Sequence, residues 1–392
     1  MHTIRHLRSS RILLVTAMVL GCFSGAVAQT RYKVTDLGRE EGKDAACAMS
    51  VNDEGWTEIM AWNGIPSQNI NFIGAALSSG RALVGIDGFK FDLKTLGGPN
   101  TWMNWGEIND FGQVVGMSET ADPDPNGEDV CGFGTNLTCR PFVWQNLHMR
   151  ALPTLGGNNG EASAVNNLGQ IAGMAEDGTV DSSCSPETTS SQTQLPVLWE
   201  DGRAHALPTP AGDTDGFAMW INDHGQAVGY TGNCGAMGHA VSWEKGKVTE
   251  LEDLGNGEGA IAYGNNNRGQ IVGSVFANSG GSIRYAALWQ NNVLTNLGTL
   301  TQLGDIASIA SGINDQGQVV GSTWNSDYNW SHAFIYQDGV MTDLNSLFPK
   351  DFNLHATMAN KINNRGQISG MGTVKSGPDM GKVHAFLATP VD

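Results

Sequence analysis

The sequence lacks the short motifs by which common enzyme classes are recognised. It contains no His-Glu-x-x-His zinc motif, no Gly-x-Ser-x-Gly nucleophile elbow, no Walker loop and no dinucleotide-binding fingerprint. It also has little charge: 16% of the residues are charged, and 22 Lys and Arg stand against 39 Asp and Glu, for a net charge of −17. A surface this acidic repels phosphate backbones, and no basic patch offsets it. The composition therefore argues against nucleic-acid binding.

Long hydrophobic runs are also missing, except for one at the N-terminus. Residues 5–11 are rich in arginine, residues 12–20 are apolar, and residues 26–28 form a small-residue cleavage site. This pattern predicts a secretory signal peptide over residues 1–28 and export from a bacterial cell, to the periplasm or beyond. The run is too short to span a bilayer comfortably, so no transmembrane segment is expected. The stretch that ends at Cys22 also resembles a lipoprotein cleavage box, and lipid anchoring at Cys22 is the alternative.

Cysteine is scarce, with six residues in 392. Exported chains oxidise their thiols. Cys131 and Cys139 bracket a short polar loop and are predicted to form a disulfide. Cys184 and Cys234 fall in equivalent loops of successive repeats and are predicted to pair as spatial neighbours. Cys47 then remains in an apolar stretch, and we interpret it as a buried, inert thiol.

Glycine, in contrast, is abundant: 52 residues punctuate a repeated nine-residue phrase. The phrase reads hydrophobe-Asn-Asp/Asn-x-Gly-Gln and ends on two small or apolar residues and a glycine. Its copies are residues 108–116, 165–173, 221–229, 265–273, 313–321 and 362–370, with a decayed copy at 51–56. Each copy predicts an apolar strand, a tight turn and a returning strand, and two further strand patterns follow. A regular period of this length indicates one supersecondary unit repeated around a shared core.

Four antiparallel strands repeated seven times describe an all-β protein, a β-propeller that closes its sheet edges by forming a ring. The mature chain begins with a fourth-strand sequence at 31–38 and ends on a third strand, so we expect the N-terminal strand to complete the last blade. A solenoid, or another blade count, is the alternative, but a solenoid would need capping repeats. The prediction is a single domain over residues 29–392. Its blades are placed near residues 45–98, 101–157, 160–210, 215–255, 258–298, 304–345 and 354–390 plus 31–38.

The repeated phrase, together with His-Ala-Phe downstream of it, resembles the HAF family of bacterial extracellular repeats. His332 and His384 begin His-Ala-Phe, and His239 begins the near variant His-Ala-Val. The resemblance covers about residues 31 to 390. It implies an exported repeat protein of unassigned activity, and it brings no catalytic residues with it. The first repeat departs from the pattern, because Trp56 stands in place of the glutamine.

Two sets of residues are candidates for metal binding. The recurrent His239, His332 and His384 sit on third strands that the rotation between blades keeps apart, so we expect each to be hydrogen-bonded within its own blade. The second set has the Asp-x-Asp-x-Asn-Gly spacing that places oxygen ligands on one side of a turn, as calcium loops do. Its members are Asp122, Asp124, Asn126 and Asp129. The loop is either a calcium site or a solvated acidic loop.

The predicted loops between second and third strands are longest in blades two and three, and they share one face with the connections between blades. Variable loops on a rigid scaffold usually carry function, so we expect the ligand there. The acids expected on this face are Glu119, Asp122, Asp124, Glu128, Asp129, Glu176, Asp177 and Asp181, and the aromatics are Trp324, Tyr328 and Trp330. The aromatics either stack on sugar rings or pack over neighbouring loops. Trp105, where other repeats have alanine, either points into the channel mouth or fills a gap in the first blade.

These observations favour a non-enzymatic exported scaffold that binds a glycan or a cell-surface protein through the long-loop face. One alternative is a secreted hydrolase or lyase with carboxylates at the channel mouth, since propellers have axial pockets. Another is a structural role in the envelope. The only cofactor indicated is calcium.

Overall fold

The computed structural model describes residues 30–64, 78–103, 107–181, 184, 192–234, 237–279, 281–326 and 330–391. The predicted signal peptide, with Cys22, lies outside these ranges. Within them the chain forms 28 β-strands and two short 3-10 turns, η1 (Thr301–Leu303) and η2 (Leu344–Leu347), and no α-helix. No helix in the described residues is long and apolar enough to cross a membrane.

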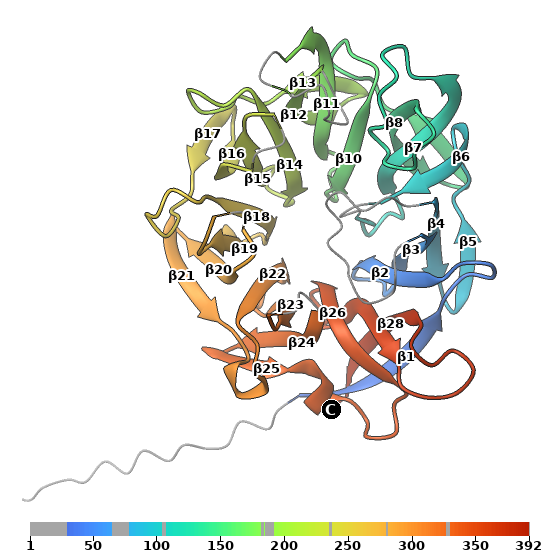
Figure 1. The fold of residues 1–392 in the computed structure, drawn as a ribbon, viewed down its shortest axis with the longest axis vertical. Coiled ribbons are helices and arrows are strands. Elements are labelled where there is room, and N and C mark those ends of the chain that lie inside the picture. The colour runs from blue at the N-terminus through green and yellow to red at the C-terminus, as the bar shows by residue number, and fades with distance from the viewer. Residues whose placement is uncertain are drawn as a thin grey trace, which may run out of the picture.

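The strands form seven four-stranded blades around one axis (Figure 1). Blades 1 and 2 contain β2 (Ala45–Val51), β3 (Thr57–Asn63), β4 (Ser79–Ile86), β5 (Phe89–Asp92), β6 (Gly97–Trp102), β7 (Val114–Pro123), β8 (Leu137–Gln145) and β9 (His148–Ala151). Blades 3 and 4 contain β10 (Gly160–Val165), β11 (Ile171–Val180), β12 (Gln192–Glu200), β13 (Arg203–Ala206), β14 (Asp215–Ile221), β15 (Ala227–Gly232), β16 (His239–Glu244) and β17 (Lys247–Glu250). Blades 5 and 6 contain β18 (Ala260–Asn265), β19 (Gln270–Phe276), β20 (Arg284–Gln290), β21 (Val293–Gly298), β22 (Ala307–Ile313), β23 (Val319–Trp324), β24 (Trp330–Gln337) and β25 (Val340–Asp343). Blade 7 contains β26 (Leu354–Ile362), β27 (Ile368–Val374), β28 (Val383–Val391) and β1 (Arg31–Gly38).

The two ends of the chain close the ring, as the sequence predicts. β1 pairs antiparallel with β28, from Arg31 opposite Val391 to Gly38 opposite Ala385. A single parallel bridge between Ala45 and Val383 also links blade 7 to blade 1. The first and last segments of the chain therefore share one blade, and the seven-bladed propeller is confirmed.

Because successive strands of a blade are antiparallel, connections alternate between two faces of the ring. The tight turns after the first and third strands lie on one face, which we call the turn face. The second-to-third loops and the connections between blades lie on the other, which we call the loop face. The repeated Asn-Asp/Asn-x-Gly phrase forms the turns nearest the axis, and its glycine has positive φ, 72° at Gly112.

A β-bulge in the innermost strand explains two columns of small residues. In blade 4 the register shifts between Ala218 and Trp220, opposite Gly229. A Cβ on Gly229 would collide with the carbonyl oxygen of Phe217, so only glycine fits there. The small size of the alanine suggests a place at the crowded axis, but the alanine does not face the axis. It packs between blades, as Ala262 does against Val228, and the bulge residue two positions later lines the axis.

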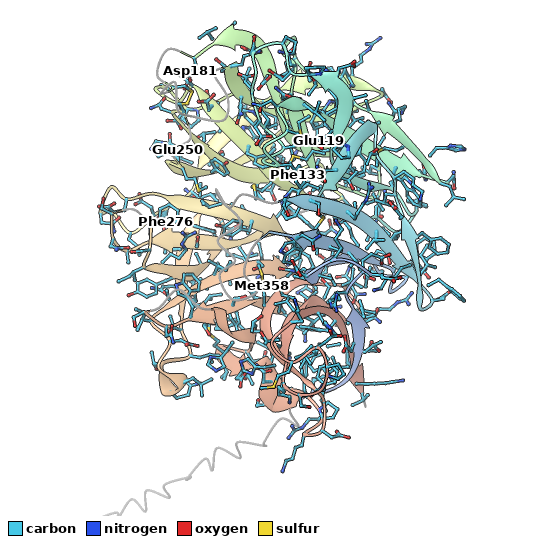
Figure 2. The ribbon with its side chains drawn as sticks, turned by 45° about the vertical axis from the view of Figure 1, so that its right-hand side comes forward. Glu119, Phe133, Asp181, Glu250, Phe276 and Met358 are labelled. Carbon is cyan, nitrogen blue, oxygen red and sulfur yellow. A yellow bond between two sulfur atoms is a disulfide. The ribbon has the colours of Figure 1, made fainter. Side chains whose placement is uncertain are left out.

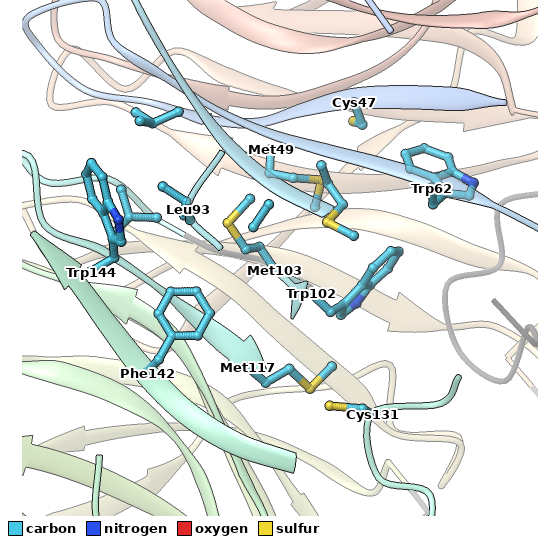
Figure 3. Close-up of a cluster of buried hydrophobic side chains, with 14 of the residues drawn as sticks. Cys47, Met49, Trp62, Leu93, Trp102, Met103, Met117, Cys131, Phe142 and Trp144 are labelled. Carbon is cyan, nitrogen blue, oxygen red and sulfur yellow. The ribbon is translucent and has the colours of Figure 1, made fainter. Parts of the chain in front are cut away.

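The core lies between the blades. The indole nitrogens of Trp199, Trp243 and Trp289 on the third strands each donate a 2.7 Å hydrogen bond to a carbonyl of the preceding blade. Figure 3 shows the methionine- and tryptophan-rich cluster shared by blades 7, 1 and 2, which includes Met103 and Trp102.

Both predicted disulfides are present. Cys131 bonds to Cys139, and Cys184 bonds to Cys234. Cys47 is free and buried, and burial raises its thiol pKa to about 12, as expected of an inert thiol.

Candidate functional site

A closed ring of hydrogen bonds ties together the seven turns nearest the axis. In each blade the repeat asparagine donates from Nδ2 to the main-chain oxygen of its equivalent in the next blade. The bonds, of 2.7–3.0 Å, run Asn52→Asn109→Asn166→Asn222→Asn266→Asn314→Asn363→Asn52. The same side chain also holds its own turn: Asn222 Oδ1 accepts from the backbone N–H groups of His224 and Gln226. The repeat asparagine therefore serves the turn and the ring together.

A second ring lies beside the first. The backbone N–H of the residue after each repeat asparagine donates, over 2.8–2.9 Å, to Oδ1 of its equivalent in the next blade. Its members are, in order, Asp53, Asp110, Asn167, Asp223, Asn267, Asp315 and Asn364. Aspartate or asparagine is needed here because both offer an acceptor oxygen on a short side chain.

Asp and Asn alternate around this ring, except at one junction. Each Asn amide donates to a neighbouring carboxylate, as Asn167 Nδ2 does to Asp110 Oδ2 over 2.9 Å and to Asp223 Oδ2 over 3.3 Å. Strict alternation cannot close over seven positions, so one like pair must occur. It falls at Asp53 and Asp110, where two carboxylates adjoin with no amide between them.

The rings surround a cavity of about 120 Å³ on the axis. The bulge column contributes Ser50, Glu107, Trp220, Gly264, Gly312 and Lys361 to its wall. Pockets for drug-sized ligands hold roughly 300–1,000 Å³. This cavity suits water, an ion or one small group better than a sugar ring.

Lys361 reaches from blade 7 across the cavity to blades 4, 5 and 6. Its Nζ lies 3.4 Å from the centroid of the Trp220 ring. It donates to the carbonyl oxygens of Ser311, over 3.0 Å, and Tyr263, over 3.4 Å. Two carbonyls and one aromatic face match the three N–H groups of an ammonium. Lys361 thus places a cation of the chain itself on the axis.

Two glutamates belong to the same electrostatic group. Burial raises the pKa values of Glu58 and Glu107 well above the ordinary value, and the charge of Lys361 opposes both shifts. Burial lowers the pKa of Lys361 to about 7, and the two glutamates oppose that shift. Neither carboxylate oxygen of Glu58 has a hydrogen-bond partner within the described chain. Burial therefore disfavours the charged form of all three groups, and their mutual attraction partly offsets that cost.

The third residue of each turn differs from blade to blade and points outward. These positions, which we call the display positions, carry Glu54, Phe111, Leu168, His224, Arg268, Gln316 and Arg365. Phe111 is 66% exposed and Leu168 is 70% exposed, although both are large and apolar. The turn face therefore combines a constant polar ring with seven variable side chains.

The predicted calcium ligands do not turn towards one point. Asp124 Oδ1 accepts from the backbone of Asn126 and Glu128, whereas Asp129 Oδ2 accepts from the backbone of Gly134. Asp122 is exposed. The group of three metal-binding side chains found in the described residues is Cys184, Asp215 and Cys234, and its two cysteines form a disulfide. Calcium binding by this loop stays a prediction.

Most acids predicted to cover the long-loop face are buried instead. Glu119 and Glu176 have no exposed surface, and Asp124, Glu128 and Asp181 are less than 9% exposed. Figure 2 labels Glu119 and Asp181 among the side chains of the blades. Buried amides hold these acids. Asn100, which precedes Glu119 in the chain, donates to it over 2.8 Å, and Asn159, which lies just before blade 3, donates to Asp124 over 2.9 Å. The expectation of an exposed acidic face is therefore wrong, because these carboxylates bind the loops to the blades.

Among the aromatics predicted to bind a ligand, the one with a described side chain is also buried. Trp324 is 6% exposed and packs with Phe276 and Ile309 in a cluster shared by blades 3 to 6. Of the two alternatives for this ring, packing holds. Tyr328 and Trp105 lie outside the described residues, and Trp330 is placed only as the first residue of β24.

The recurrent histidines are hydrogen-bonded within their own blades, as expected. Nδ1 of His239, His332 and His384 lies 2.8–3.0 Å from a carboxylate oxygen of Asp213, Asp305 and Asp36, respectively. For His239 and His332 the hydrogen bond to the aspartate raises the imidazole pKa. They fasten the third strand to the start of the blade, or in blade 7 to β1.

Glu58, Glu107 and Lys361 belong to no motif recognised in the sequence. The last two, with Trp220, occupy the position directly before the hydrophobe-Asn pair of the phrase, where the other blades have serine, alanine or glycine. Aligning the copies on that position would have revealed the outliers.

These features define the chain as a seven-bladed β-propeller with a polar axial cavity on its turn face. No family model matches the sequence, and no curated protein does. Among solved structures, the chain is similar to virginiamycin B lyase from Staphylococcus aureus, with 10% identity, a TM-score of 0.52 and coverage of 92% of this chain and 100% of that one. It is also similar to YCF48 bound to D1 peptide, with 11% identity, a TM-score of 0.51 and coverage of 94% and 97%. At such low identity these likenesses establish the fold alone.

Proposed function

We propose that this protein is an exported, non-enzymatic binding scaffold whose partner is another protein. The observation that carries the proposal is the turn face, where an unchanging double ring holds seven variable residues in fixed positions. A rigid frame with variable, exposed side chains is the usual construction of a recognition surface. A related fold, YCF48, was solved with a bound peptide, which supports a protein partner over a glycan.

Export and membership of the HAF repeat family are part of the same proposal. Two disulfides fit an oxidising compartment, and the N-terminal leader pattern provides a route to it. The repeated phrase that suggests the family also supplies both rings of the turn face.

The test is to screen the purified exported protein against a random-peptide display library and a glycan array. We expect peptides to be enriched, and we expect substitutions at display positions to weaken their binding. Binding to glycans alone would replace the protein partner with a sugar. Turnover of a polymer that is lost in Asp223→Asn would instead favour the hydrolase or lyase alternative.

A further inference from the structure

The display positions of the turn face are asymmetric, because the two apolar ones belong to the neighbouring blades 2 and 3. Three large apolar side chains are exposed on blades 2 and 3: Phe111 at 66%, Leu147 at 72% and Leu168 at 70%. Phe111 and Leu168 occupy display positions of neighbouring blades. Leu147 lies in the turn between β8 and β9, which is joined to the Phe111 turn by a 3.2 Å hydrogen bond from Gln145 Nε2 to the Phe111 oxygen. These residues lie in turns of two neighbouring blades on one side of the axis, and together we call them the apolar patch.

The like carboxylate pair borders this patch. Asp110 directly precedes Phe111, and Asp53 is its neighbour in the second ring. Elsewhere in that ring an amide stands between successive carboxylates: Asn267 Nδ2 lies 3.4 Å from Asp223 Oδ2 and 3.2 Å from Asp315 Oδ2. Neither Asp53 nor Asp110 forms an ion pair in the part of the chain that the structure describes.

Two display positions carry arginine, and neither arginine forms an ion pair with Asp53 or Asp110 in the part of the chain that the structure describes, although blade 7 adjoins blade 1. Arg268 belongs to blade 5, and Arg365 of blade 7 pairs with Glu54 over 3.4 Å. Lys361 lies below the ring, where its ammonium group contacts the Trp220 ring and donates to two carbonyl oxygens. Within the described residues, no cation therefore pairs with the Asp53–Asp110 junction, in a protein with a net charge of −17.

We propose that Asp53, Asp110, Phe111, Leu147 and Leu168 form a docking surface for an extended protein segment in which a Lys or Arg adjoins bulky apolar side chains. This inference rests on the proposed binding function and specifies its surface and partner. The partner's cation lies on the carboxylate pair, and its apolar side chains cover Phe111 and Leu168. Charge complementarity selects this occupant, because an acidic segment would add charge where two carboxylates already adjoin.

The composition of the second ring suggests a substitution that removes the carboxylate pair and preserves the fold. Asp53→Asn keeps an acceptor for the backbone N–H of Asn364, and asparagine already stands at three positions of the ring. It also converts the one like pair from two carboxylates to two amides, at Asn364 and position 53. The matched control is Asp315→Asn, which removes the same charge from the same ring but leaves the Asp53–Asp110 pair intact.

The experiment measures, by calorimetry, the binding of the peptides enriched from the random library to each variant. We expect the enriched sequences to pair a basic residue with bulky apolar ones, and affinity to fall about tenfold in Asp53→Asn and in Phe111→Ser. Asp315→Asn should stay within about twofold, as should Val340→Ser, which removes a 61% exposed apolar side chain from blade 6. Affinity should also fall as salt rises, since part of it is Coulombic.

The outcomes separate this surface from the broader proposal. Peptides that bind all four variants equally, or that are acidic, would overturn the docking surface and leave a protein-binding scaffold in place. A library that yields no binder would overturn both. Unchanged melting temperatures of the four variants establish that any loss of affinity is local.

Discussion

At the scale of single residues, the repeat asparagine has the most demanding position in the fold. It is buried in every blade, at 3–6% exposure, and its side chain satisfies two backbone donors of its own turn and one carbonyl of the next. Removing the side chain leaves buried backbone groups without partners on both sides of a blade junction. This double use explains why the asparagine occurs in all seven copies, including the decayed one.

We therefore expect Asn222→Ala to lower the free energy of unfolding by about 3 kcal/mol, the sum of one lost ring bond and two lost turn bonds. Guanidinium denaturation followed by tryptophan fluorescence measures the loss. His224→Ala, at the exposed display position of the same turn, should change stability by less than about 0.5 kcal/mol. Equal effects of the two substitutions would contradict the ring.

Asp215 is expected to make stability depend on pH. Burial raises its pKa to about 6, a hydrogen bond from the Gln194 backbone opposes the shift, and Asp181 adds to it. The folded pKa lies above the unfolded one, so its contribution is complete below the unfolded pKa and is lost as pH rises through about 6. Because the group is half-buried, we expect a loss of about 1–2 kcal/mol between pH 4 and 7. Asp215→Asn, measured by denaturation across that range, should flatten this step, and an unchanged profile would contradict the assignment.

At the scale of elements, the bulged inner strand decides which residues face the axis. The glycine opposite the bulge is required by the approach of two backbones. We expect Gly229→Ala to cost at least about 3 kcal/mol, because its Cβ would meet the Phe217 carbonyl and neither strand can move without disturbing the ring. Gly264→Ala is the matched control, since its Cβ would have only ordinary contacts of 3.6 Å or more and alanine stands at the equivalent position, Ala164. Thermal unfolding of both variants would show whether the position or glycine content as such matters.

The acidic loop of blade 2 can be tested in the same way. Asp124→Ala removes the acceptor of two backbone N–H groups and of Asn159, so we expect a loss of about 2 kcal/mol in EDTA. The exposed Asp122→Ala should remain within about 0.5 kcal/mol. A loss that appears only when calcium is added, and in both variants, would instead assign the loop to the metal. Denaturation in EDTA and in millimolar calcium distinguishes the two.

The strands and turns show which parts of the structure can be predicted from the sequence. Turn chemistry and strand periodicity predict the blades, the closure by β1 and both disulfides, because these depend on local patterns that recur. Glu107, Trp220 and Lys361 face the axis because of a register shift in the inner strand. No residue type in the sequence predicts that shift. The burial of Glu119 and Glu176 depends on amides some twenty residues earlier in the chain, and contacts of that kind cannot be derived from the loop's own composition.

At the scale of the whole molecule, the two rings and the β1–β28 pairing make the propeller one continuous circle. No blade can open without breaking ring bonds to both of its neighbours. The closing strand is anchored by Tyr32, which is 2% exposed and packs edge-to-face on Phe348 with 6.4 Å between ring centroids. The stability of every blade should therefore depend on this one strand, although it belongs to blade 7 alone.

We expect Tyr32→Ala to lower the free energy of unfolding by about 3–4 kcal/mol, the usual cost of truncating a buried aromatic side chain. Lys33→Ala, on the exposed side of the same strand, should change it by less than about 0.5 kcal/mol. The decisive feature is the shape of the curve. If the rings couple all seven blades, fluorescence and circular dichroism should report a single coincident transition at lower guanidinium. A separate early transition, with blade 7 unfolding while the others persist, would mean that the hydrogen-bonded rings join the blades without making them cooperative.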